Sequence, residues 1–197
     1  MSDPGAGAPS AFRQAVAALS AARPRPEVTL SPLPPPRRLA PHAHALGATV
    51  TEGGEELADG RFVLLHDPAG DDSWRGDFRV VTLARADLEP DLAGDPLLPE
   101  VAWSWLIEAL DARALPTHAP NGTVTRADSA FFGGLAERRG QAELELRASW
   151  TPADPADVAG HLLAWCGLLA QCAGLPPEAG TTTAVTALPR RRGPRSD

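Results

Sequence analysis

The chain has 197 residues, of which 43% are hydrophobic and 22% are charged, as in ordinary globular proteins. This length predicts one domain, and a folded part of roughly 150 residues would bury about 70% of its unfolded surface, so it needs no disulfide or metal to fold. The net charge of -7 argues against nucleic-acid binding over the whole surface, although it leaves room for a local basic patch.

The first half of the chain predicts a helix followed by about three strands. Residues 10–23 place Phe12, Val16 and Leu19 on one helical stripe. A proline-rich arm follows, beginning with a short run at residues 27–30, and we expect it to be extended and peripheral because proline cannot donate in a sheet interior. Strands are then predicted at residues 44–52, 61–66 and 77–85, the last two forming an antiparallel hairpin with a long loop.

The second half predicts two helices separated by a second hairpin. Asp95-Pro96 and Asp154-Pro155 each indicate a helix start, because Asp caps a helix and Pro is tolerated in the first turn. Between them, residues 122–132 and 141–150 have the pattern of two strands, and the second shows the clearest alternation of apolar and polar residues. Gly174 suits the left-handed position that ends the last helix.

These elements predict an α+β domain with an antiparallel sheet of about five strands and helices packed mainly on one face. The strands are joined by hairpin-like turns rather than by crossovers, which favours the antiparallel arrangement. We expect the domain to span residues 10–177. Residues 1–9 are expected to be a disordered N-terminus, and residues 178–197 a flexible, Arg-rich C-terminal tail.

The cellular location is predicted from three negative signals. Residues 1–6 have neither a basic nor an apolar targeting region, and no stretch approaches the roughly 18 apolar residues of a membrane span. Cys166 and Cys172 lie six residues apart on one predicted helix, where they cannot easily bridge. We therefore expect a soluble cytoplasmic protein with free buried thiols, no membrane contact and no cofactor.

The segment most suggestive of chemistry is the predicted hairpin loop between His66 and Asp77, with Asp67, Asp71 and Asp72. A histidine beside carboxylates can bind a metal or act as a general base. However, the spacing matches no standard metal motif, and the composition is also that of an ordinary turn. We expect no metal here and keep the loop as the site of an alternative function, an enzyme or small-ligand binder.

Other candidate chemistries have simpler structural explanations. His42 and His44 share one face of a predicted strand without a visible third ligand, and His161 lies among core-like residues of the last helix. The sequence has no Gly-x-Ser-x-Gly elbow, no Walker loop and no Gly-x-Gly-x-x-Gly motif. We therefore predict no catalytic residues and a protein that is not an enzyme.

Tryptophans at predicted boundaries indicate a partner surface. Trp150 and Trp165 complete apolar stripes and are expected in the core, whereas Trp103 faces away from the stripe of its helix and Trp74 ends a loop beside Arg75. Aromatic side chains and arginine are the residue types that dominate binding hot spots. We predict a partner-binding surface formed by Trp74, Arg75 and Trp103.

Several short segments of the chain resemble those of one known family. They are RRLAP at 37–41, LADGR at 57–61, LHDPAG at 65–70, WRG at 74–76, DPLLPEV at 95–101, GTVTR at 122–126, FGGL at 132–135, RASW at 147–150, AWC at 164–166 and LPRRRGP at 188–194. In this combination the chain, from about residue 10 onward, resembles the actinobacterial proteins grouped as domain of unknown function 3000. The resemblance implies a GC-rich actinobacterial source, which agrees with the use of arginine for all 18 basic residues.

The resemblance implies no activity and no catalytic residues. It implies genomic neighbours that include a ribonuclease-D-like exonuclease and haem-biosynthesis enzymes, an association that names neither a site nor a mechanism. Our leading hypothesis is a non-enzymatic accessory domain that interacts with another protein. The alternatives are an enzyme or ligand binder using the His66–Asp77 loop, and an RNA-processing accessory that contacts nucleic acid through the Arg-rich tail.

Overall fold

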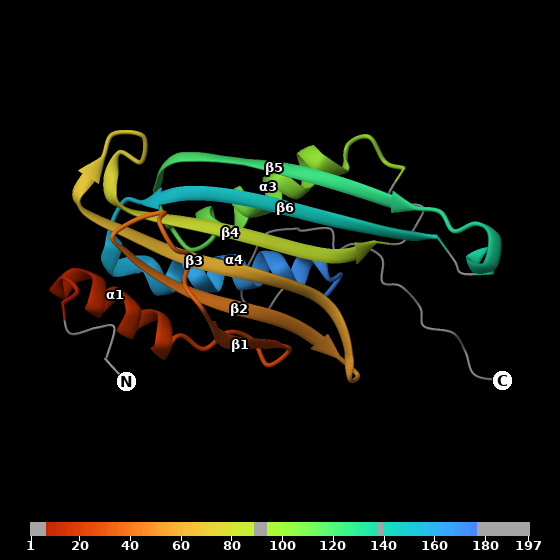
Figure 1. Cartoon of the computed structure of the whole chain (residues 1–197), viewed down its shortest axis with the longest axis horizontal. Coiled ribbons are helices and arrows are strands. Elements are labelled where there is room, and N and C mark those ends of the chain that lie inside the picture. The colour runs from red at the N-terminus through yellow and green to blue at the C-terminus, as the bar shows by residue number, and fades with distance from the viewer. Residues whose placement is uncertain (1–6, 89–93, 138–139, 177–197) are drawn as a thin grey trace.

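The computed structural model describes residues 7–88, 94–137 and 140–176. Across these residues it shows a six-stranded antiparallel sheet in the order β1-β2-β3-β4-β6-β5, with three α-helices and two short 3-10 helices (Figure 1). The strands are β1 (Val28–Leu33), β2 (His42–Glu52), β3 (Glu55–Asp71), β4 (Gly76–Leu88), β5 (Thr117–Ser129) and β6 (Gln141–Pro152). The helices are α1 (Ser10–Ala21), α3 (Leu98–Asp111), η1 (Gly133–Leu135), η2 (Pro155–Asp157) and α4 (Val158–Cys172).

The predicted α+β class and antiparallel sheet are confirmed, with one strand more than the five or so expected. The additional strand is β1, which pairs with β2 from Val28 to Leu33. Its position at the edge of the sheet explains how it accommodates Pro32, because an edge strand needs hydrogen bonds on one side only. The proline-rich arm was predicted to be extended and peripheral. The structure adds that its first part is an edge strand of the sheet.

The aspartate of each Asp-Pro pair accepts a hydrogen bond from a backbone N–H group that lies N-terminal to the α-helix. A carboxylate oxygen of Asp95 accepts from the backbone N–H of Leu97 at 2.9 Å, and α3 starts at Leu98. Asp154 accepts from the N–H of Ala156 at 2.8 Å and caps η2, the single turn that precedes α4. Each aspartate thus organises a turn in front of the helix, and the predicted helix starts are two or three residues early.

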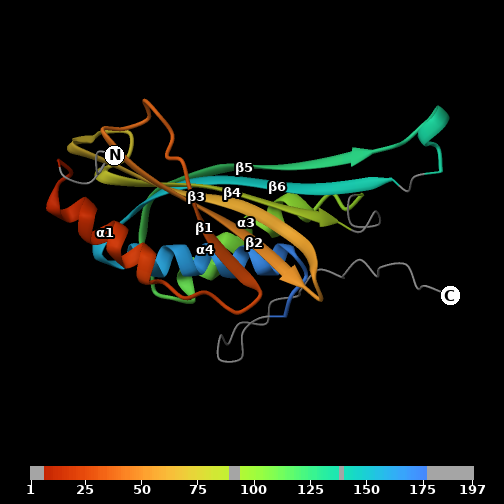
Figure 2. The same ribbon diagram turned by 60° about the horizontal axis from the view of Figure 1, so that its bottom comes forward.

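The main core lies between the sheet and the helices. We call the sheet surface that contributes to it the core face. Trp150 and Trp165 are completely buried there, as predicted. A Cβ atom at Gly60 would lie 2.6 Å from Cζ2 of Trp165, so the absence of a side chain lets the indole lie directly on β3. Figure 2 shows α4 running beneath the strands.

A second, smaller apolar cluster lies on the opposite sheet surface, which we call the outer face. Ala45, Val63 and Leu65 are buried in it, and Trp74 and Val81 pack against them. The outer face is therefore partly covered, whereas the alternation of residues 141–150 alone predicts one fully wet face.

Most of the two terminal segments predicted to be disordered lies outside the residues that the structure describes. Of the residues predicted to be disordered, 1–6 and 178–197 lie outside the described residues, whereas Ala8 is buried against the core. In the part of the chain that the structure describes, no helix is both long and apolar enough to cross a membrane.

Candidate ligand-binding groove

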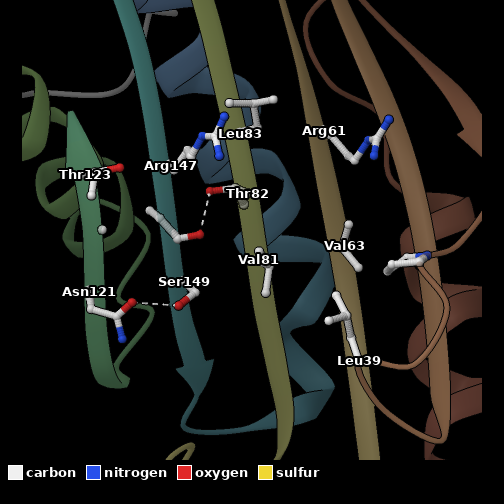
Figure 3. Close-up of a pocket in the computed structure, with 13 residues that line it drawn as sticks. Leu39, Arg61, Val63, Val81, Thr82, Leu83, Asn121, Thr123, Arg147 and Ser149 are labelled. Atoms are coloured by element: carbon white, nitrogen blue, oxygen red, sulfur yellow. Dashed lines mark hydrogen bonds between the residues drawn. The ribbon is translucent and has the colours of Figure 1, made fainter. Parts of the chain in front are cut away.

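Two rows of side chains cross the outer face on strands β3, β4, β6 and β5. Strand side chains alternate between the two surfaces of a sheet, so the residues of both rows share one face. The first row, in strand register, is Arg61, Leu83, Arg147 and Thr123. The second row, two residues along each strand, is Val63, Val81, Ser149 and Asn121. Figure 3 shows both rows crossing the strands.

These rows form the floor of a groove of about 560 Å³. Pro36 and Leu39, from the connection between β1 and β2, complete its lining. Leu39 is 57% exposed although it is a large apolar side chain. A volume of this size lies within the range of about 300–1,000 Å³ that binding sites occupy. We call this feature the outer-face groove.

The two arginines of the groove differ in how their charge is balanced. Glu145 accepts from Nε of Arg147 at 2.7 Å through one carboxylate oxygen and from Nε of Arg85 at 2.9 Å through the other. These bonds hold the pKa of Glu145 below its ordinary value. Arg61, in contrast, is exposed and has no hydrogen-bond or ion-pair partner among the described residues. The groove therefore presents one cation that is not neutralised within the protein.

A buried arginine fixes the polar end of the groove. Arg79 is 4% exposed and donates to the carbonyl of Ala119 at 3.0 Å and to Oγ of Ser149 at 2.8 Å. Ser149 in turn donates to Oδ1 of Asn121 at 2.9 Å, as drawn in Figure 3. Burial lowers the pKa of Arg79 below its ordinary value. Arg79 thus orients the hydroxyl and amide that line the groove.

The charge of the outer face changes along the strands. Next to the first row lie Asp59, Arg85 and Glu145, which are aligned across β3, β4 and β6. One row further, Asp87 and Glu143 are paired across β4 and β6. The face is therefore acidic at one end, basic in the row of Arg61, and apolar or neutral in the row of Val81.

The residues predicted to form a partner surface are not brought together. Trp74 is half-buried in the outer-face cluster, and its carbonyl accepts from Oγ1 of Thr151 at 2.7 Å. Arg75 is exposed, with a left-handed φ of 59°. Trp103 is half-buried on the core face, where a Cβ atom at Gly122 would lie 2.6 Å from its ring. Trp74 and Trp103 therefore lie on opposite surfaces of the sheet.

The residues of the predicted acidic loop also point in different directions. His66 is on β3, 2% exposed, and donates from Nδ1 to the carbonyl of Asp77 at 3.0 Å while its ring stacks on Phe78. Asp67 accepts from the N–H of Ala69, and Asp71 accepts from Ser73. The bonds from Ser73 lower the pKa of Asp71. Asp72 is exposed on the turn.

We predict that no metal ion binds tightly to this loop. Among the described residues, no group of three or more His, Cys, Asp and Glu side chains is placed to hold one. Ligands that are not preorganised bind metals weakly. Calorimetric titration with zinc, manganese and magnesium should therefore show no stoichiometric site. A stoichiometric zinc site that disappears in His66→Ala but persists in a control, Thr29→Gln, would contradict this prediction and favour the enzyme alternative.

Comparison with known proteins identifies the family of the chain. No curated protein and no solved structure matches it. The family model described as protein of unknown function (DUF3000) matches residues 8–182, which cover all the strands and helices described above. The chain belongs to this family of proteins of unknown function.

Proposed function

We propose that this protein is a non-enzymatic accessory domain that binds another protein through the outer-face groove. The observation that carries the proposal is the first row of the groove, where Leu83 lies between Arg61 and Arg147. Arginine beside half-buried apolar side chains is typical of binding hot spots. Because the row is built on strands rather than on loops, its side chains are held by a rigid scaffold, as a recognition surface requires.

The alternative functions have less support. In the β3–β4 hairpin, Asp67 and Asp71 accept hydrogen bonds within turns, and His66 faces the core. An RNA-processing role would depend on the Arg-rich tail at residues 178–197, which lies outside the described residues. Neither alternative uses the groove.

We place the protein in the cytoplasm. Cys166 and Cys172 are both free and buried in α4. Burial raises the pKa of each thiol to about 12, so both remain protonated and unreactive at neutral pH. Thiols of this kind are compatible with a reducing compartment.

The test compares partner capture by the wild-type protein and by Leu83→Gln. Leu83 is half-buried at the centre of the first row, so glutamine removes apolar contact area without adding a charge. We expect the amount of each specific partner captured from lysate of the native host, measured by quantitative mass spectrometry, to fall about tenfold or more, as for a hot-spot residue. The melting temperature should fall by only a few degrees.

The matched control is Thr29→Gln, an exposed position on β1 that β2 separates from the groove. This variant should capture the same partners as the wild-type protein. Trp74→Ala provides a second comparison, because Trp74 packs against the cluster that includes Val63 and Val81. Equal capture by Leu83→Gln and Thr29→Gln would show that the groove is not the partner surface.

A further inference from the structure

We propose that the outer-face groove recognises an extended segment of its partner in which one carboxylate side chain lies two residues from one apolar side chain. This inference rests on the proposed function and names the chemistry of the segment that binds. It follows from three features of the described residues: an arginine without a counter-ion, an apolar row beside it, and acidic rows on its other side.

The carboxylate is inferred from Arg61. Its guanidinium is exposed and has no partner in the described part of the chain. Arg147 lies in the same row on the other side of Leu83, about 10 Å away at the backbone, since neighbouring strands are about 4.8 Å apart. Glu145 accepts from Arg147 through Nε, so the outer nitrogens of that guanidinium also remain as donors. A carboxylate above Leu83 would therefore meet two guanidinium groups, which bind carboxylates well.

The apolar side chain is inferred from the second row. Val63 is buried and Val81 half-buried, and Leu39 stands exposed at the edge of the groove. The two rows are two residues apart along each strand, or about 6.8 Å. The same distance separates alternate side chains on one face of an extended peptide. A segment lying along the strands can thus place its carboxylate on Arg61 and its apolar side chain on Val81.

The acidic rows restrict the segment to one carboxylate. Asp59 and Glu145 lie beside the first row, on the side away from Val81, with Arg85 between them, and Asp87 and Glu143 follow. A second carboxylate two residues further on would meet Asp59 and Glu145, and Arg85 between them already donates to Glu145. Like charges in proximity weaken binding. The same rows, with the net charge of -7, oppose nucleic acid, which carries a negative charge at every nucleotide. The charge distribution therefore favours a peptide with a single acid.

The test uses a phage-displayed library of random twelve-residue peptides as the probe. The library is selected in parallel on the full-length wild-type chain, Arg61→Glu, Leu83→Gln and the control Thr29→Gln. On the wild-type chain and the control, we expect enriched peptides to share Asp or Glu two positions from an apolar residue. In the peptides enriched on the Arg61→Glu variant, we expect Lys or Arg at the position of the acid, because the charge that selects this position has been reversed.

One enriched peptide is then synthesised with its acid and with the matching amide. Replacing the carboxylate should weaken binding to the wild-type chain about tenfold and leave binding to Arg61→Glu unchanged or stronger, since the two changes act on one interaction. Three results would each overturn the inference. The peptides enriched on the wild-type chain lack an acid, the Arg61→Glu variant still selects an acid, or the wild-type chain enriches no peptide.

The design separates this inference from the proposed function. If Leu83→Gln loses both peptides and cellular partners while the acid proves irrelevant, the groove remains the partner surface and only the chemistry assigned to its ligand is wrong. If Leu83→Gln retains both, the groove is not the binding surface and both proposals fail.

Discussion

Trp150→Ala and Trp165→Ala should each lower the free energy of unfolding by about 3–5 kcal/mol, the usual cost of removing a large aromatic side chain from a packed core. Both indoles are completely buried. Trp165 packs on β3 where Gly60 leaves space for it and lies 5.8 Å, between ring centroids, from Phe62. Trp150 is on β6, and its Nε1–H donates to Nδ1 of His161 at 3.2 Å. Each truncation therefore opens a cavity that the surrounding strands and α4 can fill only in part.

Denaturant unfolding of both variants measures this effect. Trp74→Ala and Trp103→Ala provide the comparison, because both residues are only half-buried and should cost less. Trp103 packs against the core beside Gly122, so we expect its truncation to cost more than that of an exposed side chain. Midpoints close to that of the wild-type protein for Trp150→Ala and Trp165→Ala would contradict the packing described here.

The burial of these two tryptophans was predictable because each lies on a regular local pattern. Leu144, Leu146 and Trp150 alternate with polar residues along β6, and Trp165 lies on the apolar stripe of α4. Local periodicity specifies which face of an element is buried.

The groove was not predictable in the same way, because it depends on strand register. Arg61, Leu83 and Arg147 lie in three separate strands, and only the pairing of β3 with β4 and of β4 with β6 aligns them. The polar alternation around Arg147 was visible in the sequence, and it shows that this residue faces away from the core. It does not show which residues lie beside Arg147 on the neighbouring strands.

Segments that fold over the outer face were also missed. Trp74 has no alternating pattern around it, yet it packs against the outer-face cluster of Ala45, Val63 and Leu65. His66 was predicted to end its strand and to border an open loop, although β3 extends to Asp71 and holds the histidine on the core face. In both cases a tertiary contact decides the environment of the residue, and the local sequence does not contain it.

Lowering the pH from 6.5 to 4 should reduce the stability of the protein by up to about 3 kcal/mol through His161 alone. This histidine is 1% exposed in α4, and burial lowers its pKa from the ordinary value of 6.5 to about 4, although Asp157 nearby opposes the change. In the unfolded chain the same ring takes up a proton near pH 6.5. Between these two values the unfolded state binds more protons, so the stabilisation is complete above pH 6.5 and is lost as the pH falls towards 4.

Other titratable groups also make the free energy of unfolding depend on pH, and their contributions can be separated from that of His161. Burial also lowers the pKa of His44, so this histidine acts in the same direction. The carboxylates of Asp71 and Glu145 have lowered pKa values, and their contribution is lost only below their ordinary values of 3.8 and 4.5. Measurements between pH 5 and 7 therefore report mainly on the histidines.

The variant that isolates His161 is His161→Asn, because asparagine can still accept the hydrogen bond from Trp150 without titrating. Its free energy of unfolding, measured in urea at intervals from pH 5 to pH 7.5, should change with pH much less than that of the wild-type protein. Removing His44 in the same way, as His44→Asn, should remove a smaller part of the slope. An unchanged slope in His161→Asn would mean that His161 has the same pKa in the folded and the unfolded chain. Its ring would then be protonated at pH 5 in the folded protein and could not accept a hydrogen bond from the indole of Trp150. The contact at the centre of the core would then have to be assigned differently.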